Sequence, residues 1–253
     1  MMQVYMITFS PTGGTDKVAR ALSVGLCCRP QELSLLRPLT ESNTPVFGSG
    51  DLCVVAMPVY GGRIPTAAAE RLRTLRGNGA KAAAVAVYGN REIDDALVEM
   101  EDILTDCGFT LIAGAEAVAE HSIVRKYGEG RPDVKDELEL EAMGRAIADK
   151  FVRGDLHRPK LPGNRPYKVF GGGLKPLVDQ RCGLCGICAG LCPVGAIPFH
   201  APNTTDTSKC ISCMRCLSVC PSRSRYLDPK ALAGLSEHLA PVCAGRKKNK
   251  LYI

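Results

Sequence analysis

Residues 182–193 read CGLCGICAGLCP, and residues 210–221 read CISCMRCLSVCP. Each stretch places four cysteines with two, two and three residues between them, and each ends in a proline. The second motif begins 28 residues after the first, so this part of the chain contains an internal duplication. Eight of the 13 cysteines belong to these matched runs, and their regular spacing predicts a role in metal binding.

Cys-x-x-Cys pairs occur in zinc sites, in redox dithiols and in iron–sulfur sites. A zinc site ordinarily uses two pairs separated by a longer loop, whereas here three cysteines share one short loop. Three thiolates from one loop can hold three corners of a 4Fe–4S cubane, and in the bacterial two-cluster pattern the fourth ligand comes from the other run. We therefore predict two 4Fe–4S clusters, with zinc or structural disulfides as the alternatives. The pattern assigns one cluster to Cys182, Cys185, Cys188 and Cys220, and the other to Cys210, Cys213, Cys216 and Cys192.

Residues 180–225 resemble the dicluster ferredoxins of bacteria, and the two tandem motifs carry the resemblance. Residues 165–253 contain 13 Lys or Arg and 4 Asp or Glu, a balance of +9, whereas residues 1–164 contain 19 and 22, a balance of −3. An oxidised cluster with four thiolates brings a charge of about −2, so we expect the basic excess to balance clusters and not to bind nucleic acid. The basic stretch at 245–250 is expected to be a solvated terminus.

The first 153 residues alternate apolar runs with amphipathic segments. Strands are expected at 3–9, 31–36, 51–60, 80–89 and 109–119, and helices at 15–26, 65–76, 93–108 and 133–154. This alternation predicts an α/β fold with a doubly wound parallel sheet. Residues 154–178 are rich in proline and glycine and are expected to form a linker. The remaining residues, 179–253, would form a small α+β domain with a basic tail.

The stretch FSPTGGTDKVA, residues 9–19, connects the first expected strand to the first expected helix. It offers three hydroxyls and two glycines, and the N–H groups of a helix start converge there with the positive end of the helix dipole. These features predict a phosphate site at Ser10, Thr12, Gly13, Gly14 and Thr15. The alternative is an ordinary helix start with Thr15 as the N-cap.

Two further loops follow the third and fourth expected strands and read MPVYGGRIP (57–65) and VYGNREIDD (87–95). Ligands of open α/β sheets bind beyond the carboxyl ends of the strands, and FMN binds there in the flavodoxin-like strand order. Tyr60 and Tyr88 are the best aromatic residues to stack on a flavin ring, since the chain has no tryptophan. The candidate FMN residues in these loops are Pro58, Val59, Tyr60, Gly61, Tyr88, Gly89, Asn90 and Arg91.

With these three loops, residues 1–153 resemble a flavodoxin, and the whole chain is similar to the flavodoxin–ferredoxin fusion proteins of anaerobic bacteria and archaea. The stretches YGNR (88–91) and EHSIVRKYGEGRPD (120–133) add to the likeness. The resemblance implies a five-stranded flavodoxin-like sheet of order 2-1-3-4-5 that binds FMN and exchanges electrons with the ferredoxin domain. His121 is a candidate for facing the flavin and supplying a proton, although an ordinary loop histidine is the simpler interpretation.

The leading hypothesis is an electron-transfer protein that passes electrons between two 4Fe–4S clusters, FMN and a redox partner such as a ferredoxin or a reductase. The alternatives are a flavin-dependent reductase of a small organic acceptor and, with less support, a redox-sensing interaction module. A homodimer is possible. No apolar run reaches the ~20 residues of a membrane span, and the N-terminus lacks the features of a secretory signal, so a cytoplasmic location is expected.

Overall fold

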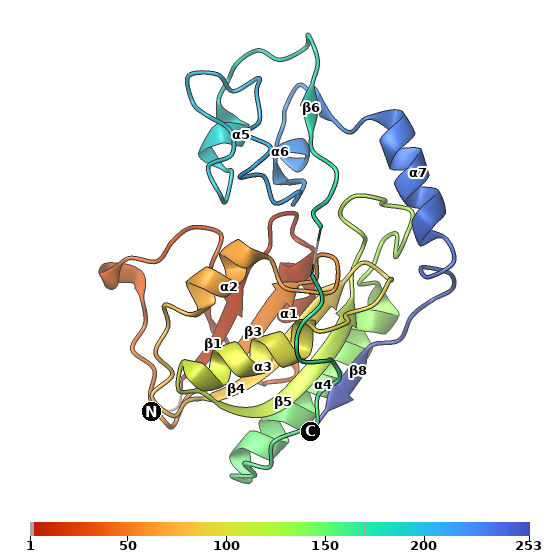
Figure 1. Cartoon of the computed structure of the whole chain (residues 1–253). Coiled ribbons are helices and arrows are strands. Elements are labelled where there is room, and N and C mark those ends of the chain that lie inside the picture. Colours follow the sequence, from red (N-terminus) through yellow and green to blue (C-terminus); the bar gives the residue numbers. More distant parts are fainter. Residues whose placement is uncertain (1–2, 170) are drawn as a thin grey trace.

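The computed structural model describes residues 3–169 and 171–253. It has a larger α/β part and a smaller, cysteine-rich part that lies over one edge of the sheet (Figure 1). The elements in chain order are β1 (Val4–Thr8), α1 (Gly14–Val24), β2 (Gln31–Ser34), the 3-10 turn η1 (Glu41–Asn43), β3 (Leu52–Pro58), α2 (Thr66–Leu72), β4 (Lys81–Tyr88), α3 (Ala96–Asp106), β5 (Thr110–Val118), α4 (Val134–Val152), β6 (Leu177–Val178), α5 (Ile187–Gly190), α6 (Arg215–Ser218), β7 (Arg225–Tyr226), α7 (Pro229–Leu239) and β8 (Lys250–Tyr252). Within the described residues, no helix is long and apolar enough to cross a membrane.

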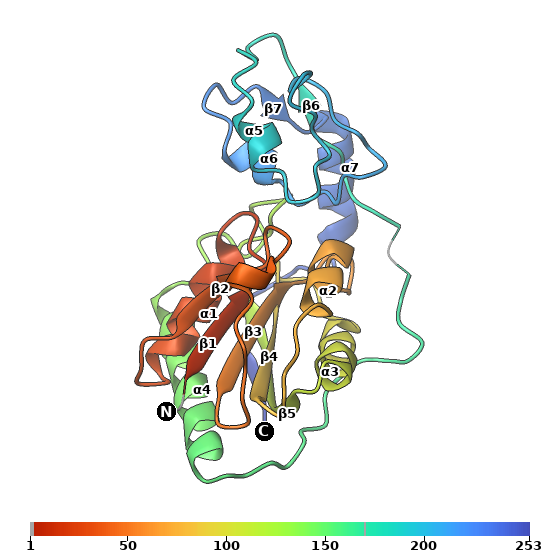
Figure 2. The same ribbon diagram turned by 90° about the vertical axis from the view of Figure 1, so that its left-hand side faces the viewer.

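The central sheet has the strand order β2-β1-β3-β4-β5-β8. Its first five strands are parallel, so the predicted flavodoxin-like order is confirmed. Every residue of β3 is buried because helices cover both faces of the sheet. Helices α1 and α4 pack on one face, and α2 and α3 pack on the other (Figure 2).

The C-terminal segment is not a solvated terminus, and that prediction is wrong. Strand β8 adds to the sheet, antiparallel to β5. Ahead of it, Arg246 forms ion pairs with Asp133 (2.7 Å) and Asp136 (3.0 Å) at the start of α4. The side chain of Asn249 accepts a hydrogen bond from the Val118 N–H at 2.9 Å. The basic tail therefore returns to the flavodoxin-like part and does not extend the cysteine-rich part.

The cysteine-rich part repeats its backbone as well as its sequence. Helices α5 and α6 begin 28 residues apart, each after a residue in the left-handed conformation, Gly186 (φ 73°) and Met214 (φ 60°). Strands β6 and β7 pair antiparallel and close the module. Because β6 begins at Leu177, the last two residues of the expected linker already belong to this module.

The linker is held against helix α3 and does not hang free (Figure 2). The carboxylate of Asp95 accepts hydrogen bonds from the backbone N–H groups of Asn164 (2.8 Å) and Lys168 (2.6 Å). Arg165 forms an ion pair with Asp102 at 2.6 Å. Leu161 lies against Gly114 of β5, where a Cβ atom would approach its side chain to 2.4 Å. These contacts set the path by which the chain reaches the cysteine module.

Arginine–carbonyl contacts fix the cysteine module over the carboxyl ends of the parallel strands. Arg37 donates to the carbonyl oxygen of Gly190, and Arg71 donates to that of Pro193. In the opposite direction, Arg215 of the module donates to the carbonyl oxygen of Pro11 at 2.8 Å. The module therefore covers the edge of the sheet at which a flavodoxin-like fold binds its ligand.

Candidate cofactor sites

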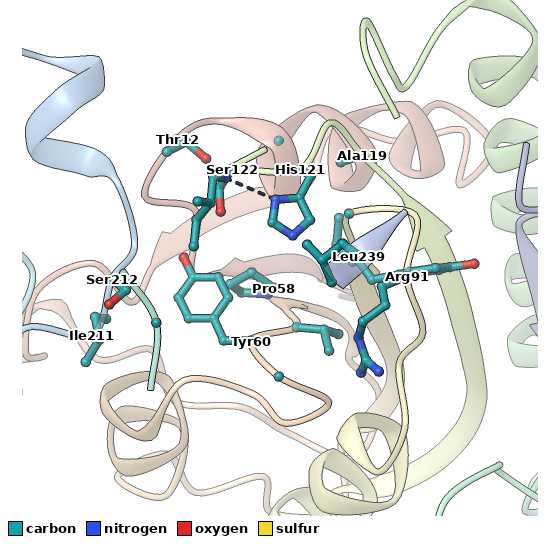
Figure 3. Close-up of a pocket in the computed structure, with 18 of the residues that line it drawn as sticks. Thr12, Pro58, Tyr60, Arg91, Ala119, His121, Ser122, Ile211, Ser212 and Leu239 are labelled. Carbon is teal, nitrogen blue, oxygen red and sulfur yellow. Dashed lines mark hydrogen bonds between the residues drawn. The ribbon is translucent and has the colours of Figure 1, made fainter. Parts of the chain in front are cut away.

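A cavity of about 380 Å³ lies at the carboxyl edge of the sheet, between the two parts of the chain (Figure 3). All three loops singled out from the sequence contribute to its lining. The predicted residues that line it are Thr12, Gly14, Thr15, Pro58, Val59, Tyr60, Gly61, Tyr88, Gly89, Arg91 and His121. We call this space the flavin cavity from here on, because it lies where the sequence predicts FMN.

The first loop forms one end of the flavin cavity through the geometry of the α1 start. Gly13 precedes α1 with a φ of 89°, a conformation that suits glycine. The Ser10 hydroxyl accepts a hydrogen bond from the Asp16 N–H at 3.0 Å and so holds the loop closed. Ser10 and Gly13 shape the loop without lining the cavity. Thr15 lies inside α1, so the alternative that made it the N-cap is wrong.

Tyr60 and Tyr88 come from neighbouring strand ends and both line the flavin cavity. Burial raises the pKa of each phenol, so both are neutral hydroxyls at physiological pH. Gly89 is required beside Tyr88 because a Cβ atom there would lie 2.6 Å from the ring of His121. The packing of this loop therefore fixes the position of the histidine.

The His121 ring lies at the wall of the flavin cavity (Figure 3). Its Nδ1 atom accepts hydrogen bonds from the backbone N–H groups of Ile123 (3.1 Å) and Val124 (3.0 Å). Burial, together with the nearby Arg91 charge, lowers its pKa to about 4. The ring is therefore neutral at pH 7, and its proton resides on Nε2 because Nδ1 is an acceptor. The Nε2–H is therefore the hydrogen-bond donor that His121 offers at this wall.

Two other predicted polar residues hold the protein together. Asn90 does not line the cavity, and its amide donates to the carbonyl oxygens of Cys243 and Gly245, both at 2.8 Å. Arg91 lines the cavity and forms an ion pair with Asp94. No sequence pattern connects Asn90 with a segment more than 150 residues away.

Further lining residues were not singled out from the sequence, and several come from segments that it did not connect with this site. They are Pro11, Val87, Ala119, Glu120, Ser122, Ile123, Lys168, Val169, Gly171, Gly172, Gly173, Ile211, Ser212, Leu235, His238 and Leu239. The linker, the second cysteine motif and helix α7 thus close the cavity on the side that is open in the flavodoxin-like part alone. The sequence feature that could have indicated this closure is the run of glycines at 171–173. Glycine permits a close approach there, because a Cβ atom at Gly173 would lie 3.0 Å from the Cβ of Ser212.

The eight motif cysteines gather around two separate small cavities. One cavity is lined by Cys182, Cys185, Cys188 and Cys220. The other is lined by Cys192, Cys210, Cys213 and Cys216. These are the two crossed sets assigned from the spacing, and each has three ligands from one run and one from the other. Among the described residues, no three Cys, His, Asp or Glu side chains come together closely enough to hold a single metal ion.

The cysteine thiols differ in how readily they lose a proton. Burial raises the pKa of Cys213 to about 12 and that of Cys216 to about 11. Burial also acts to raise the pKa of Cys220, but hydrogen bonds from the Ser224 and Ser222 hydroxyls and nearby N–H groups outweigh it and lower the value to about 6. Thiolates are the metal ligands, so iron would have to displace protons from the buried pair, whereas the lowered pKa of Cys220 favours its thiolate.

Two buried polar atoms lack a hydrogen-bond partner in the part of the chain that the structure describes, and each belongs to a residue lining one of these cavities. The first is Ser212 Oγ, on a side chain 5% exposed that lines the flavin cavity. The second is Nε of Arg225, which is 4% exposed and lines the cavity of Cys220. A buried cation without a carboxylate partner requires another anion, and a cluster of charge about −2 supplies one. The donor sets therefore fit a flavin in the larger cavity and iron–sulfur clusters in the two smaller ones.

Residues 204–225 match the model of the 4Fe-4S binding domain family. No curated protein matched the chain. Among solved structures, the chain is similar to rubredoxin oxygen:oxidoreductase from Desulfovibrio gigas, at 16% identity and TM-score 0.43, over 60% of this chain and 36% of that chain. It is also similar to a flavodoxin of Streptococcus pneumonia TIGR4 (19%, TM-score 0.40, 59% of this chain and 99% of that one). A third is flavodoxin 2 from Bacillus cereus (17%, TM-score 0.44, 58% and 99%). The chain thus spans little more than a third of the Desulfovibrio protein and nearly all of both flavodoxins.

Proposed function

Because the chain is a fusion of a flavodoxin-like fold and a 4Fe–4S ferredoxin domain, we propose that it is an iron–sulfur flavoprotein that transfers electrons between two 4Fe–4S clusters and FMN. One observation carries the proposal. Ile211 and Ser212 lie between two cysteines of the second motif, and both line the flavin cavity. A cluster loop and a flavin site therefore share one wall within a single chain.

The cluster of Cys192, Cys210, Cys213 and Cys216 is the one nearer the flavin cavity. Ser212, the residue before Cys213 of this set, lines that cavity together with Tyr60. The Ile211 side chain lines both the flavin cavity and the cavity of this cluster. We call this the inner cluster, and the cluster of Cys182, Cys185, Cys188 and Cys220 the outer cluster. The proposed order of electron transfer is from the outer cluster to the inner cluster and then to the flavin, or the reverse.

The residues of the flavin cavity would hold FMN in three ways. Thr12, Gly14 and Thr15 surround the start of α1, which suits the phosphate. Tyr60 and Tyr88 offer flat faces for the ring, and the Nε2–H of His121 offers a donor. A bound flavin takes two electrons and releases them one at a time, whereas a 4Fe–4S cluster carries one. Lys168, Val169, Gly171, Gly172, Gly173, Ser212 and Leu239 cover part of the same space.

The test is to purify the protein without oxygen and to measure its visible spectrum and its iron, sulfide and flavin contents. We expect about eight irons and one FMN per chain, from the two-cluster and flavodoxin-like patterns. Flavin without iron, or zinc in its place, would overturn the proposed clusters, and iron without flavin would overturn the proposed FMN site. Reduction of the clusters that does not spread to the flavin would overturn the electron transfer itself.

A second cavity favours the alternative of a reductase that acts on a small acceptor. It measures about 530 Å³ and shares Tyr60, Gly171, Gly172 and Ile211 with the flavin cavity. Arg63, Arg73 and Lys175 line it, and Glu99 is the one carboxylate among its described lining residues. Such a lining suits a small anion. Multiple turnovers with small anionic acceptors that fail in an Arg73→Ala variant would establish this alternative.

A further inference from the structure

The duplication of the cysteine module places two equivalent residues in opposite surroundings. Leu184 and Ser212 each precede the second cysteine of their motif, 28 residues apart, and have φ angles of 54° and 55°. The backbone that follows is also equivalent, because α5 and α6 begin three residues later in both halves. Leu184 and Ser212 therefore hold the same position relative to the cluster of their own motif.

The surroundings of the two loops differ in what covers them. Ser212 is 5% exposed because the flavin cavity and the linker lie against it. Leu184 is 59% exposed, and Cys185 beside it is also exposed. The loop of the inner cluster thus faces a cofactor site, whereas the corresponding loop of the outer cluster faces solvent.

On the basis of the proposed function, we propose that residues 183–187, with Phe199, form the docking site for a separate electron-carrier protein. The carrier would lie against Leu184 as the flavin cavity lies against Ser212. The surface of the carrier that docks here would have an apolar centre surrounded by carboxylates. This surface would lie close to the carrier's own redox centre. We call the residues Leu184, Cys185, Ile187 and Phe199 the outer face.

The outer face has the apolar centre that a docking site needs. Leu184, Ile187 and Phe199 are 59%, 42% and 74% exposed, an unusual concentration of large apolar side chains around one exposed cysteine. The Phe199 ring lies over Gly190, at 3.5 Å from the position a Cβ would take there. The three side chains therefore belong to one surface around α5, and burying them against a partner would release water from all three.

Charge at the margin of the outer face indicates the chemistry of the partner. Residues 179–228 contain five Lys or Arg and three Asp or Glu. Arg223 is exposed beside the outer cluster and has no carboxylate partner among the described residues, whereas the exposed Arg181 pairs with Asp179 at 2.6 Å. The Arg223 cation beside an apolar centre favours a partner surface that carries carboxylates, and this attraction speeds the encounter.

The test compares two reductants in stopped-flow measurements on the full chain loaded with its clusters and flavin. The first is a reduced bacterial two-cluster ferredoxin with an acidic surface, and the second is dithionite, which needs no docking site. We expect Leu184→Glu and Phe199→Glu to lower the second-order rate constant with the ferredoxin by about tenfold or more, because the new carboxylate repels the partner. Val152→Glu, at an exposed apolar position on α4, is the matched control and should change neither rate.

The salt dependence of the rate with the ferredoxin is a second measurement, and it does not depend on a substitution in the cluster loop. The rate with the ferredoxin should fall as salt rises, and Arg223→Gln should reduce that dependence. Equal rates in wild type and both outer-face variants would overturn the proposal, as would equal slowing with dithionite, which would indicate damage to the cluster. A concentration-dependent dimer that Leu184→Glu dissociates would make a second copy the occupant and also overturn it. Rapid cluster reduction that never reaches the flavin would instead refute the proposed function and leave the docking site intact.

Discussion

Nη1 of Arg215 donates a hydrogen bond to the carbonyl oxygen of Pro11 across 2.8 Å. Arg215 belongs to the second cysteine motif, and Pro11 belongs to the loop that begins the flavin cavity. This single bond therefore joins the loop of the inner cluster to the site proposed for FMN. Contacts between domains in one chain are often weak enough to permit relative motion, so such a bond has a direct consequence for electron transfer.

Replacement of Arg215 by methionine should slow electron transfer between the inner cluster and the flavin. The variant keeps much of the side-chain volume but removes a charged donor, whose hydrogen bond is worth about 1.5–3 kcal/mol. We expect a rate lower by about tenfold, measured as the change in flavin absorbance after rapid reduction of the clusters. Arg215→Lys keeps a donor and should lie between the two. An unchanged rate in Arg215→Met would show that other contacts hold the module in place.

Ser212→Ala should weaken FMN binding if the buried hydroxyl donates to the flavin. The Ser212 oxygen has no partner among the described residues, so the bond it would form with FMN is worth about 1 kcal/mol. We expect the dissociation constant to rise about fivefold, measured from the fluorescence of released FMN. Leu184→Ala changes the equivalent position of the other motif and should leave FMN affinity unchanged. Equal affinity in Ser212→Ala and wild type would place the hydroxyl's partner elsewhere.

Cys192→Ser and Cys220→Ser should have different effects although both remove a fourth ligand. Cys192 lines the cavity of the inner cluster, so its loss should stop electron transfer from the clusters to the flavin. Cys220 lines the cavity of the outer cluster, so its loss should slow electron entry and leave the inner cluster able to reduce the flavin. Electron paramagnetic resonance spectra and iron contents would identify which cluster is lost. The reverse pattern would show that the two clusters are placed the other way round.

The architecture was predictable because its signals are local. The strand–helix alternation of residues 1–153 follows from side-chain burial along each segment, and the crossed cysteine sets follow from spacing alone. The start of α1 was also placed within a residue, since the glycines and hydroxyls of residues 10–15 act on their own backbone. Each of these patterns needs only neighbouring residues to be read correctly.

The contacts that complete the site were not predictable because they join distant segments. The basic tail at 245–250 looked solvated, since the carboxylates that pair with it are more than 100 residues away. Asn90 resembled a cofactor contact, yet its amide donates to the carbonyl oxygens of Cys243 and Gly245, at the start of the same tail. The closure of the cavity by Ser212 and helix α7 likewise depends on how the two parts of the chain pack. Neither the hydrophobic periodicity nor the cysteine spacing of the sequence predicts that packing.

Asn249→Ala should destabilise the flavodoxin-like part. The Asn249 side chain is 9% exposed, accepts from the Val118 N–H and donates to Asp136 (3.0 Å) and Glu139 (2.8 Å). Its loss leaves a buried N–H and a buried carboxylate short of a partner, at a cost of about 1–3 kcal/mol. Urea unfolding followed by circular dichroism would measure the change. Lys248→Ala, at an exposed neighbour, is the control and should cost less than about 0.5 kcal/mol.

The pH dependence of the flavin potential tests the state of His121. Burial, with a contribution from Arg91, lowers the pKa of this ring to about 4, so it stays neutral at every pH above that value. A group that does not titrate between about pH 5 and pH 8 adds no proton-linked change there. We therefore expect wild type and His121→Gln to show the same slope of midpoint potential against pH in spectroelectrochemical titrations. A change of slope near pH 6.5 in wild type that disappears in His121→Gln would mean that the ring gains its proton in that range and acts as the proton source proposed from the sequence.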